Sequence, residues 1–390
     1  MNFVFSNKVN DMKPSAIREI FKFLSDPNVI SFAAGNPSPL SFPSEKMHCI
    51  ANNIFENRAS IAFQYGITEG YPRLREQVRE RLKNKFNTGT DHDDVIITTG
   101  GQQGIDLCAK VLCNEGDTVI CENPSFIGAL NAFRSYKANL VGVDLEEDGM
   151  NIEALECALK NNPNTKIIYV IPTFQNPSGI TTSLEKRKAI LTLAEKYNVL
   201  ILEDNPYGEL RFSGENVPTI KSLDTKGHVL YCSSFSKILS AGMRIGFVCG
   251  PKELVQKIVV VKQVNDVHTN QFFQMVASEF IDSYGLDDHI EFIRNLYREK
   301  CVLMLDCLDK YVGDKAAFTR PDGGLFIWLT VNGGNGDDIA KRALENKVAV
   351  VTGSSFNPIQ GGFSPSVRLN YSTPSDEQIV EGVKRLSAIL

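Results

Sequence analysis

The sequence lacks the cysteine spacings that mark a disulfide framework or a zinc site. Its nine cysteines are an odd number, and no two of them are spaced as Cys-x-x-Cys. Disulfide-rich domains use an even set of cysteines, and structural zinc sites commonly use closely spaced pairs. We therefore expect free cysteines, several of them acting as small buried apolar residues, and no bound metal.

Hydrophobic runs of membrane-spanning length are also missing. A transmembrane helix needs about eighteen or more consecutive apolar residues, and the sequence contains no such run. Residues 1–25 mix charged and apolar side chains and show no signal-peptide core. We expect no association with a membrane and a cytoplasmic location.

A large excess of one charge is absent as well. The chain has 41 Lys and Arg against 46 Asp and Glu, a net charge of -5, and no long basic run. This balance gives no reason to expect nucleic acid as a partner. The 390 residues, 43% of them hydrophobic and 22% charged, have ordinary globular composition and suffice for one large domain and a smaller one.

Short apolar runs alternate with helical patterns from about residue 95. The candidate strands are residues 95–99, 117–121, 139–143, 166–171, 199–202, 229–232 and 245–249. A helix is expected over residues 101–112, and Thr182-Ser183-Leu184-Glu185 has the spacing of a capping box that opens another. This alternation favours an α/β fold around a buried, mostly parallel sheet. Ligands of such sheets bind beyond the carboxyl ends of the strands.

The pattern changes after about residue 285. A long helix is expected over residues 289–312, strands over 325–330, 348–351 and 367–371, and a final helix from Ser375. These elements predict a smaller α+β domain, with the first 40 or so residues packed beside it. We divide the chain into residues 1–43 (an N-terminal arm and part of the small domain), 44–285 (the large domain) and 286–390 (the small C-terminal domain).

Four segments whose groups could take part in binding or catalysis follow predicted strands. Thr99 to Gly104 is a glycine-rich turn whose helix-start amides can bind phosphate, although alone it could be a simple turn. Asn176-Pro177-Ser178-Gly179 alone reads as a loop. Asp204 ends a buried strand, where a carboxylate is costly unless it meets a cation, although a helix N-cap or turn is the alternative.

The fourth segment, Ser233-Ser234-Phe235-Ser236-Lys237, precedes Gly242-Met243-Arg244-Ile245-Gly246. A lysine and an arginine between two buried strands are poorly placed if their only role is to keep the protein soluble.

Four motifs, taken together and in this order, give the chain a resemblance to a known family: Asn176, Asp204-x-x-Tyr207, Ser-x-Ser-Lys237 and Gly-x-Arg244-x-Gly. The chain looks like the fold-type I aminotransferases of class I/II that use pyridoxal 5'-phosphate (PLP). Its appearance is nearest to the kynurenine, 2-aminoadipate and aromatic aminotransferase subgroup, over nearly the whole chain. The resemblance implies a large domain with a mostly parallel seven-stranded sheet, a smaller α+β domain, and a role in amino-acid metabolism: transfer of an amino group from an α-amino acid to a 2-oxo acid.

The resemblance also implies roles for individual residues. Lys237 would bond to PLP and carry a proton, Asp204 would pair with the pyridine nitrogen, and Tyr207 would act with Asn176 on the phenolic oxygen. Phe126 would stack on the ring. The phosphate would be held by Gly101, Gln102, Ser234, Ser236 and Arg244, and by Tyr65 of a neighbouring subunit.

The same likeness predicts the substrate contacts and the assembly. Arg368 would bind the α-carboxylate with its planar fork, and Gly35 would lie in a segment that folds over the substrate. Arg18 would be a mobile arginine near the substrate side chain, serving both dicarboxylic and aromatic substrates, or else an exposed helix residue. A homodimer with shared active sites is implied by Tyr65. The peptide bond between Asn176 and Pro177 is expected to be cis.

Two other readings of the same motifs stay open. A carbon–sulfur β-lyase that uses PLP shares nearly all the residues around the cofactor. A ligand-sensing domain of a PLP-containing transcription regulator is the third reading. Such regulators carry an N-terminal DNA-binding domain, and the resemblance begins near Lys13, so we expect no room for one.

Overall fold

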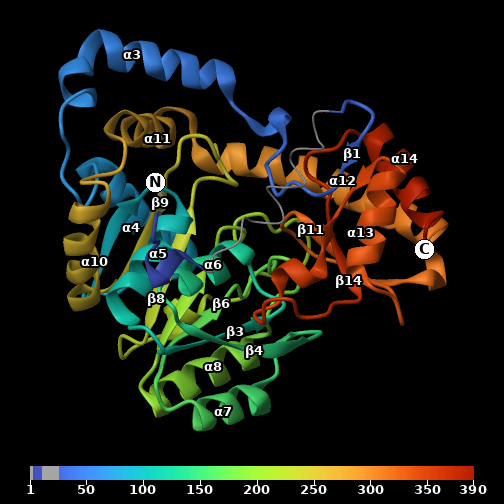
Figure 1. Cartoon of the computed structure of the whole chain (residues 1–390). Coiled ribbons are helices and arrows are strands. Elements are labelled where there is room, and N and C mark those ends of the chain that lie inside the picture. The colour runs from blue at the N-terminus through green and yellow to red at the C-terminus, as the bar shows by residue number, and fades with distance from the viewer. Residues whose placement is uncertain (1–2, 11–25) are drawn as a thin grey trace.

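The computed structural model describes residues 3–10 and 26–390 and places the predicted α/β elements around one large sheet (Figure 1). The strand order is β2-β9-β8-β7-β6-β3-β4-β5. Their bounds are β2 (Asp93–Thr98), β3 (Thr118–Asn123), β4 (Asn139–Glu146), β5 (Gly149–Met150), β6 (Thr165–Val170), β7 (Leu200–Asp204), β8 (Val229–Ser234) and β9 (Gly246–Pro251). The expected fold class is confirmed.

The sheet is mostly parallel but has eight strands where seven were expected. Strands β4, β3, β6, β7 and β8 run parallel, and β9 and β2 run antiparallel to their neighbours. The additional strand, β5, has only two residues and pairs with the end of β4 in a tight antiparallel hairpin. A hairpin extension this short has no apolar run for the sequence pattern to reveal.

Alternate residues of the central strands enter two different cores. Val119, Ile167 and Leu202 belong to one buried cluster, and their neighbours Ile120, Ile168 and Ile201 to the other. Strand residues point to opposite faces in turn, so the sheet is covered by helices on both sides (Figure 1). The helices between residues 44 and 284 are α3 (Ser44–Ala62), α4 (Pro72–Phe86), α5 (Gly101–Leu112), α6 (Ile127–Ser135), α7 (Ile152–Asn161), α8 (Leu184–Tyr197), α9 (Ile220–Leu223), α10 (Lys252–Asn265) and α11 (Gln271–Tyr284), and α3 packs on α11.

The start of α8 corrects one detail of the sequence analysis. The N-cap is Ser183, whose side chain accepts from the amide of Lys186, and not Thr182. Thr182 is buried, and its carbonyl accepts a 2.9 Å bond from Nε of Arg187, so it belongs to the preceding loop. A true capping box does occur at the start of the last helix of the chain, between Ser375 and Gln378.

The C-terminal third builds a second, antiparallel sheet (Figure 1). Its order is β10 (Ala317–Phe318), β11 (Phe326–Thr330), β14 (Ser366–Asn370) and β13 (Val351–Thr352). The helices of this part are α12 (Leu286–Tyr311), α13 (Gly336–Glu345) and α14 (Asp376–Ser387), with α12 packed along α14. Shorter helices are α1 (Asn7–Asn10), η2 (Pro39–Ser41), η3 (Gly313–Lys315) and η4 (Gly353–Phe356).

The single strand expected over residues 348–351 is divided into two. β12 (Val348–Ala349) pairs in parallel with β1 (Ile30–Ser31), whereas Val351 of β13 pairs with Arg368. The chain changes partners at this point because the N-terminal segment also needs backbone hydrogen bonds. Residues Ile30 and Ser31 thus lie beside Val348 and Ala349.

Two kinds of feature are absent from the described ranges. None of the helices in residues 3–10 and 26–390 is both long and apolar enough to cross a membrane. Within the same ranges no group of three or more His, Cys, Asp or Glu side chains could hold a metal ion.

Candidate active site

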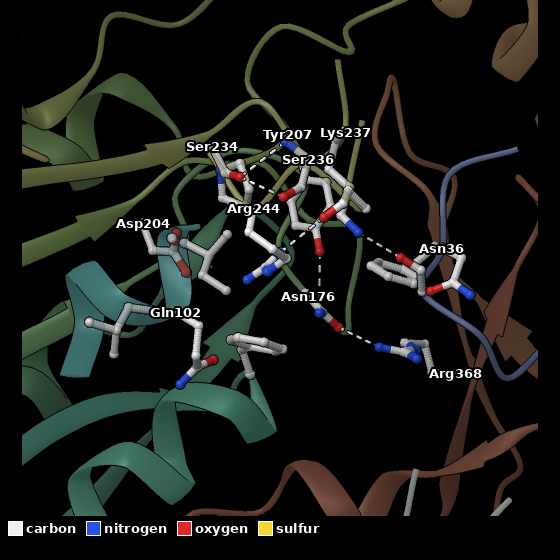
Figure 2. A pocket seen from close by; sticks show the side chains of 18 residues that line it. Asn36, Gln102, Asn176, Asp204, Tyr207, Ser234, Ser236, Lys237, Arg244 and Arg368 are labelled. Atoms are coloured by element: carbon white, nitrogen blue, oxygen red, sulfur yellow. Dashed lines mark hydrogen bonds between the residues drawn. The ribbon is translucent and has the colours of Figure 1, made fainter. Parts of the chain in front are cut away.

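A cavity of about 480 Å³ lies at the carboxyl ends of the central strands, where they face β11 and β14. Figure 2 shows side chains from the turns after β7 and β8 converging on it from one side and Arg368 from the other. Its lining contains Gly35, Asn36, Gly101, Gln102, Ile105, Phe126, Ile171, Asn176, Asp204, Pro206, Tyr207, Ser234, Ser236, Lys237, Ala241, Arg244, Phe326 and Arg368. Twelve of the fourteen residues singled out in the sequence meet there.

One end of the cavity is suited to bind an anion. Gly101 and Gln102 begin α5, where backbone amides lack partners within the helix. Gly100 has φ +74, and a Cβ there would lie 2.3 Å from Nη2 of Arg244. A side chain at position 100 would therefore displace the guanidinium from the helix start. The Ser234 hydroxyl donates a 2.7 Å bond to the Ser236 hydroxyl, which adds polar groups at the same end.

Asp204 is a buried carboxylate at the end of β7. The Tyr169 hydroxyl donates a 2.8 Å hydrogen bond to its Oδ2. Burial raises the pKa of Asp204 to about 7, and the Tyr169 hydrogen bond offsets only part of this rise. Among the residues that the structure describes, Asp204 has no ion pair. A cationic ring nitrogen in the cavity would supply the missing partner.

A chain of hydrogen bonds joins Tyr207, Asn176 and Arg368. Nδ2 of Asn176 donates to the Tyr207 hydroxyl at 3.3 Å, and Nη1 of Arg368 donates to Oδ1 of Asn176 at 2.8 Å (Figure 2). The bond between Asn176 and Pro177 is cis, as expected. The amide of Asn176 thus connects the side of the cavity that holds Tyr207 with the side that holds the buried arginine.

Arg368 is almost completely buried, with an exposed fraction of 2%. Its guanidinium lies 4.2 Å from the ring centre of Phe326 and 4.9 Å from that of Phe356. Nη2 donates to the carbonyl of Ala33, but the buried Nε has no hydrogen-bond partner. Burial lowers the pKa of Arg368 to about 10. A buried guanidinium with an unused donor is suited to bind a carboxylate.

Lys237 lies between Asp204 and Arg368 and points across the cavity. Its Nζ donates a 2.7 Å bond to the carbonyl of Gly35 (Figure 2). Loss of solvent around the amine, and then the positive charges of Arg368 and Arg244, lower the pKa of Lys237 to about 8. An amine with such a pKa is partly neutral near pH 8, which makes it a nucleophile and a proton acceptor.

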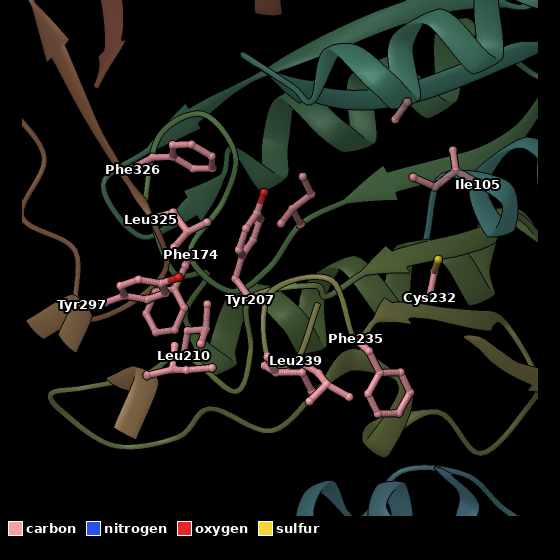
Figure 3. Close-up of a cluster of buried hydrophobic side chains, with 14 of the residues drawn as sticks. Ile105, Phe174, Tyr207, Leu210, Cys232, Phe235, Leu239, Tyr297, Leu325 and Phe326 are labelled. Atoms are coloured by element: carbon pink, nitrogen blue, oxygen red, sulfur yellow. The ribbon is translucent and has the colours of Figure 1, made fainter. Parts of the chain in front are cut away.

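An apolar wall completes the cavity. The Phe326 and Tyr207 rings meet edge to face with centres 5.8 Å apart, and both belong to a buried apolar cluster (Figure 3). Phe126, at the N-cap of α6, also lines the cavity. The Tyr207 ring therefore packs against Phe326, while its hydroxyl bonds to Asn176.

One of the predicted residues lies elsewhere. Tyr65 follows α3, has an exposed fraction of 81%, and packs edge-on against His268 outside the cavity. Arg18 lies outside the described residues.

The structure adds residues that the sequence analysis missed. Tyr169 bonds to Asp204, Phe326 packs on Arg368, and Asn36 lines the cavity next to Gly35. Tyr169 and Phe326 fall inside predicted strands, and nothing in the local pattern separates them from core residues. Asn36 adjoins a glycine already singled out, which is the one signal that could have found it.

Comparison with known proteins gives concordant matches. The family described as aminotransferase class I and II matches residues 27–386. The chain is 38% identical to aromatic-amino-acid aminotransferase 1 of Thermococcus litoralis, over 98% of this chain and 93% of that one. It is also 38% identical to the 2-aminoadipate transaminase of Thermus thermophilus, over 99% and 96%. The solved kynurenine aminotransferase of Pyrococcus horikoshii, in complex with PMP, superposes with a TM-score of 0.94 at 38% identity, over 98% and 96%.

Proposed function

The chain belongs to the class I and II aminotransferases, and from this premise we propose how its side chains divide the work of amino transfer. The cofactor is pyridoxal phosphate. The observation that carries the proposal is the position of Lys237, whose amine lies in one cavity with an unpaired buried carboxylate and a buried arginine.

The donors and acceptors of the cavity fit that cofactor. The unpaired Asp204 would hold its ring nitrogen protonated, and Asn176 and Tyr207 would bind its phenolic oxygen. The amides of Gly101 and Gln102, with Ser234, Ser236 and Arg244, would hold its phosphate. Phe126 would cover one ring face. When bound, pyridoxal phosphate supplies an aldehyde that accepts amino groups and a ring that withdraws electrons.

The remaining steps belong to the protein. Arg368 would bind the substrate α-carboxylate through its planar fork, with Asn176 holding the guanidinium in position. Lys237 would bond to the cofactor aldehyde at rest. After the substrate displaces it, its neutral amine would take the proton from the substrate Cα and deliver it to the cofactor carbon C4′ on the same face. The low pKa of Lys237 keeps it ready for this role.

We propose aromatic amino acids and the dicarboxylic pair 2-aminoadipate and glutamate as substrates, with 2-oxoglutarate as acceptor. The names of the relatives and the apolar ring of Phe326 in the lining support aromatic substrates. The described lining has three cations, Lys237, Arg244 and Arg368, and each already has a role in the proposal. A distal carboxylate would therefore rely on Arg18.

Steady-state kinetics with a panel of amino donors tests this function. Arg18→Ala should lower kcat/KM for 2-aminoadipate by about tenfold or more, the cost of a lost charged contact, but by less than about threefold for phenylalanine. Equal losses on both substrates would reject the role of Arg18. Release of pyruvate and a thiol from cysteine conjugates, without amino transfer, would assign the chain to the β-lyases instead.

We further propose that the enzyme works as a homodimer in which Tyr65 completes the neighbour's phosphate site. Phe63 and Tyr65 are 73% and 81% exposed, and they lie beside the stacked rings of Phe55 and Phe272. Exposed aromatic side chains gathered in this way are typical of a surface that another chain covers.

Two variants test the shared site. Phe63→Asp should halve the particle mass measured by sedimentation equilibrium, because it places a charge in the interface. Tyr65→Phe should leave the mass unchanged but weaken PLP binding about tenfold, the usual cost of a lost hydrogen bond to a charged group. A monomeric wild-type protein, or unchanged PLP affinity in Tyr65→Phe, would contradict the proposal.

A further inference from the structure

A buried lysine lies behind the glycine-rich turn, outside the cavity itself. Lys262 of α10 has an exposed fraction of 0%. Its Nζ donates to Asp266 at 2.7 and 2.9 Å, to Oε1 of Gln103 at 3.0 Å and to the Thr269 hydroxyl at 3.1 Å. Its three N–H groups are therefore all used within the protein. We call Lys262, Asp266, Gln103, Thr269 and Thr99 the Lys262 cluster.

The Lys262 cluster holds the turn at Thr99 from two sides. The Thr99 amide donates to Oε1 of Gln103 at 2.8 Å, and its hydroxyl donates to Oδ2 of Asp266 at 2.7 Å. Nε2 of Gln103 also donates to Oδ2 of Asp266 at 2.7 Å. The Thr99 hydroxyl also lies 3.1 Å from that of Thr269, and all three partners of Thr99 bond to Lys262. α10 packs directly against α5, so the cluster joins the two helices (Figure 1).

The position of Thr99 determines where the anion-binding amides point. Thr99 precedes Gly100, whose φ of +74 only a glycine adopts readily, and Gly101 and Gln102 follow at once. Gly100 exchanges hydrogen bonds with Thr98, through its amide to the Thr98 carbonyl and through its carbonyl from the Thr98 hydroxyl. The side chain and amide of Thr99 are restrained by the Lys262 cluster.

A role in stability alone does not account well for this arrangement. Burying an ammonium costs several kcal/mol in desolvation, so an ion pair such as Lys262–Asp266, in which the lysine is fully buried and the aspartate a quarter exposed, commonly adds little net stability. What such a pair does supply is a fixed geometry for every group bonded to it. Here those groups are Thr99 and Gln103, on either side of the two amides.

We infer that Lys262 is a positioning residue for the cofactor phosphate, acting through Asp266, Gln103 and Thr99 on the amides of Gly101 and Gln102. This inference rests on the proposed function, which places the phosphate at the start of α5. Lys262 touches neither cofactor nor substrate. Its loss should weaken binding of the phosphate while leaving the contacts to the cofactor ring in place.

The test compares apoprotein affinity for PLP with affinity for pyridoxal, which has the same ring and aldehyde but no phosphate. The ratio of the two dissociation constants isolates the phosphate contribution. Lys262→Met should lower the wild-type preference for PLP by about tenfold or more, because several amide contacts lose their alignment. Thr99→Val, a smaller change that keeps the ion pair, should lower it several-fold.

Lys221→Met is the matched control. Lys221 is an equally buried lysine bonded to Asp93 and Asp224, and Asp93 begins β2, the strand whose other end leads into Thr99. This variant should lower stability to a similar degree but keep the preference for PLP. If Lys262→Met does not fold, the preference of Thr99→Val for PLP over pyridoxal tests the inference instead.

The outcomes separate the inference from the function on which it rests. A wild-type protein that binds PLP and pyridoxal equally well would refute the phosphate site and the inference with it. A strong wild-type preference that both Lys262→Met and Thr99→Val retain would overturn the inference alone. A loss of preference in Lys221→Met as large as in Lys262→Met would also overturn it, because the effect would then be general loosening.

Discussion

Replacement of Lys237 by alanine should abolish amino transfer almost completely while leaving cofactor affinity largely in place. The side chain is expected to act as both nucleophile and proton carrier, so kcat should fall by about 10⁴-fold or more, the upper range for a positioned proton carrier. The phosphate and ring contacts do not involve the amine, so equilibrium dialysis should still find PLP bound. Stopped-flow and steady-state assays measure the rate.

Lys237→Arg is the matched control for charge. It keeps the positive charge between Arg368 and Arg244, but a guanidinium does not give up its proton near neutral pH. It should therefore be about as inactive as the alanine variant. Turnover within about tenfold of wild type in either variant would show that another group carries the proton.

Replacement of Asp204 by asparagine should slow catalysis and, in the apoprotein, increase stability. An amide cannot keep the cofactor nitrogen protonated, so kcat should fall by about 10²–10³-fold, the typical cost of losing one well-placed electrostatic contact. Asparagine can still accept the hydrogen bond of Tyr169, so the local structure should persist.

The stability effect has a defined pH dependence. The folded-state pKa of Asp204 is raised to about 7 from 3.8, so the folded apoprotein binds more protons than the unfolded chain between these values. Its stability should therefore fall as the pH rises through this window. Asp204→Asn should gain little at pH 4 and a few kcal/mol at pH 8, at about 1.4 kcal/mol per pKa unit.

Urea unfolding of the apoprotein at several pH values measures this gain. The neighbouring Glu203→Gln is the matched control. Glu203 is equally buried but accepts from the backbone amides of Ile220 and Lys221, away from the cavity. It should keep kcat within about threefold of wild type, since it faces the other side of the sheet. An Asp204→Asn enzyme with unchanged kcat, or an apoprotein no more stable at pH 8, would contradict the assignment.

The turns that build the cavity could be predicted because their chemistry is local. Asp204, Ser234 and Gly101 each follow an apolar run, and parallel strands bring their carboxyl ends to one edge. The order of the motifs along the chain then indicated the family. Periodicity therefore located the strands and turns, and the motifs identified which turns carry chemistry.

Contacts between distant segments could not be predicted in this way. Lys262 bonds to Gln103 across 159 residues, and Arg368 bonds to Asn176 across 192. Nothing near Phe326 or Tyr169 in sequence distinguishes them from ordinary core residues. Chain geometry also decided that Val348 and Val351 pair with different strands, a choice that depends on where the N-terminal segment lies.

The most direct test of the account follows the cofactor spectrum of the wild-type enzyme through one half-reaction. The absorbance band of bound PLP, at roughly 360–430 nm, should disappear when glutamate is added without an acceptor. About one equivalent of 2-oxoglutarate should appear per active site, and added 2-oxo acid should restore the band. A band that no amino acid of the panel removes, or one lost without a 2-oxo acid product, would contradict amino transfer at Lys237.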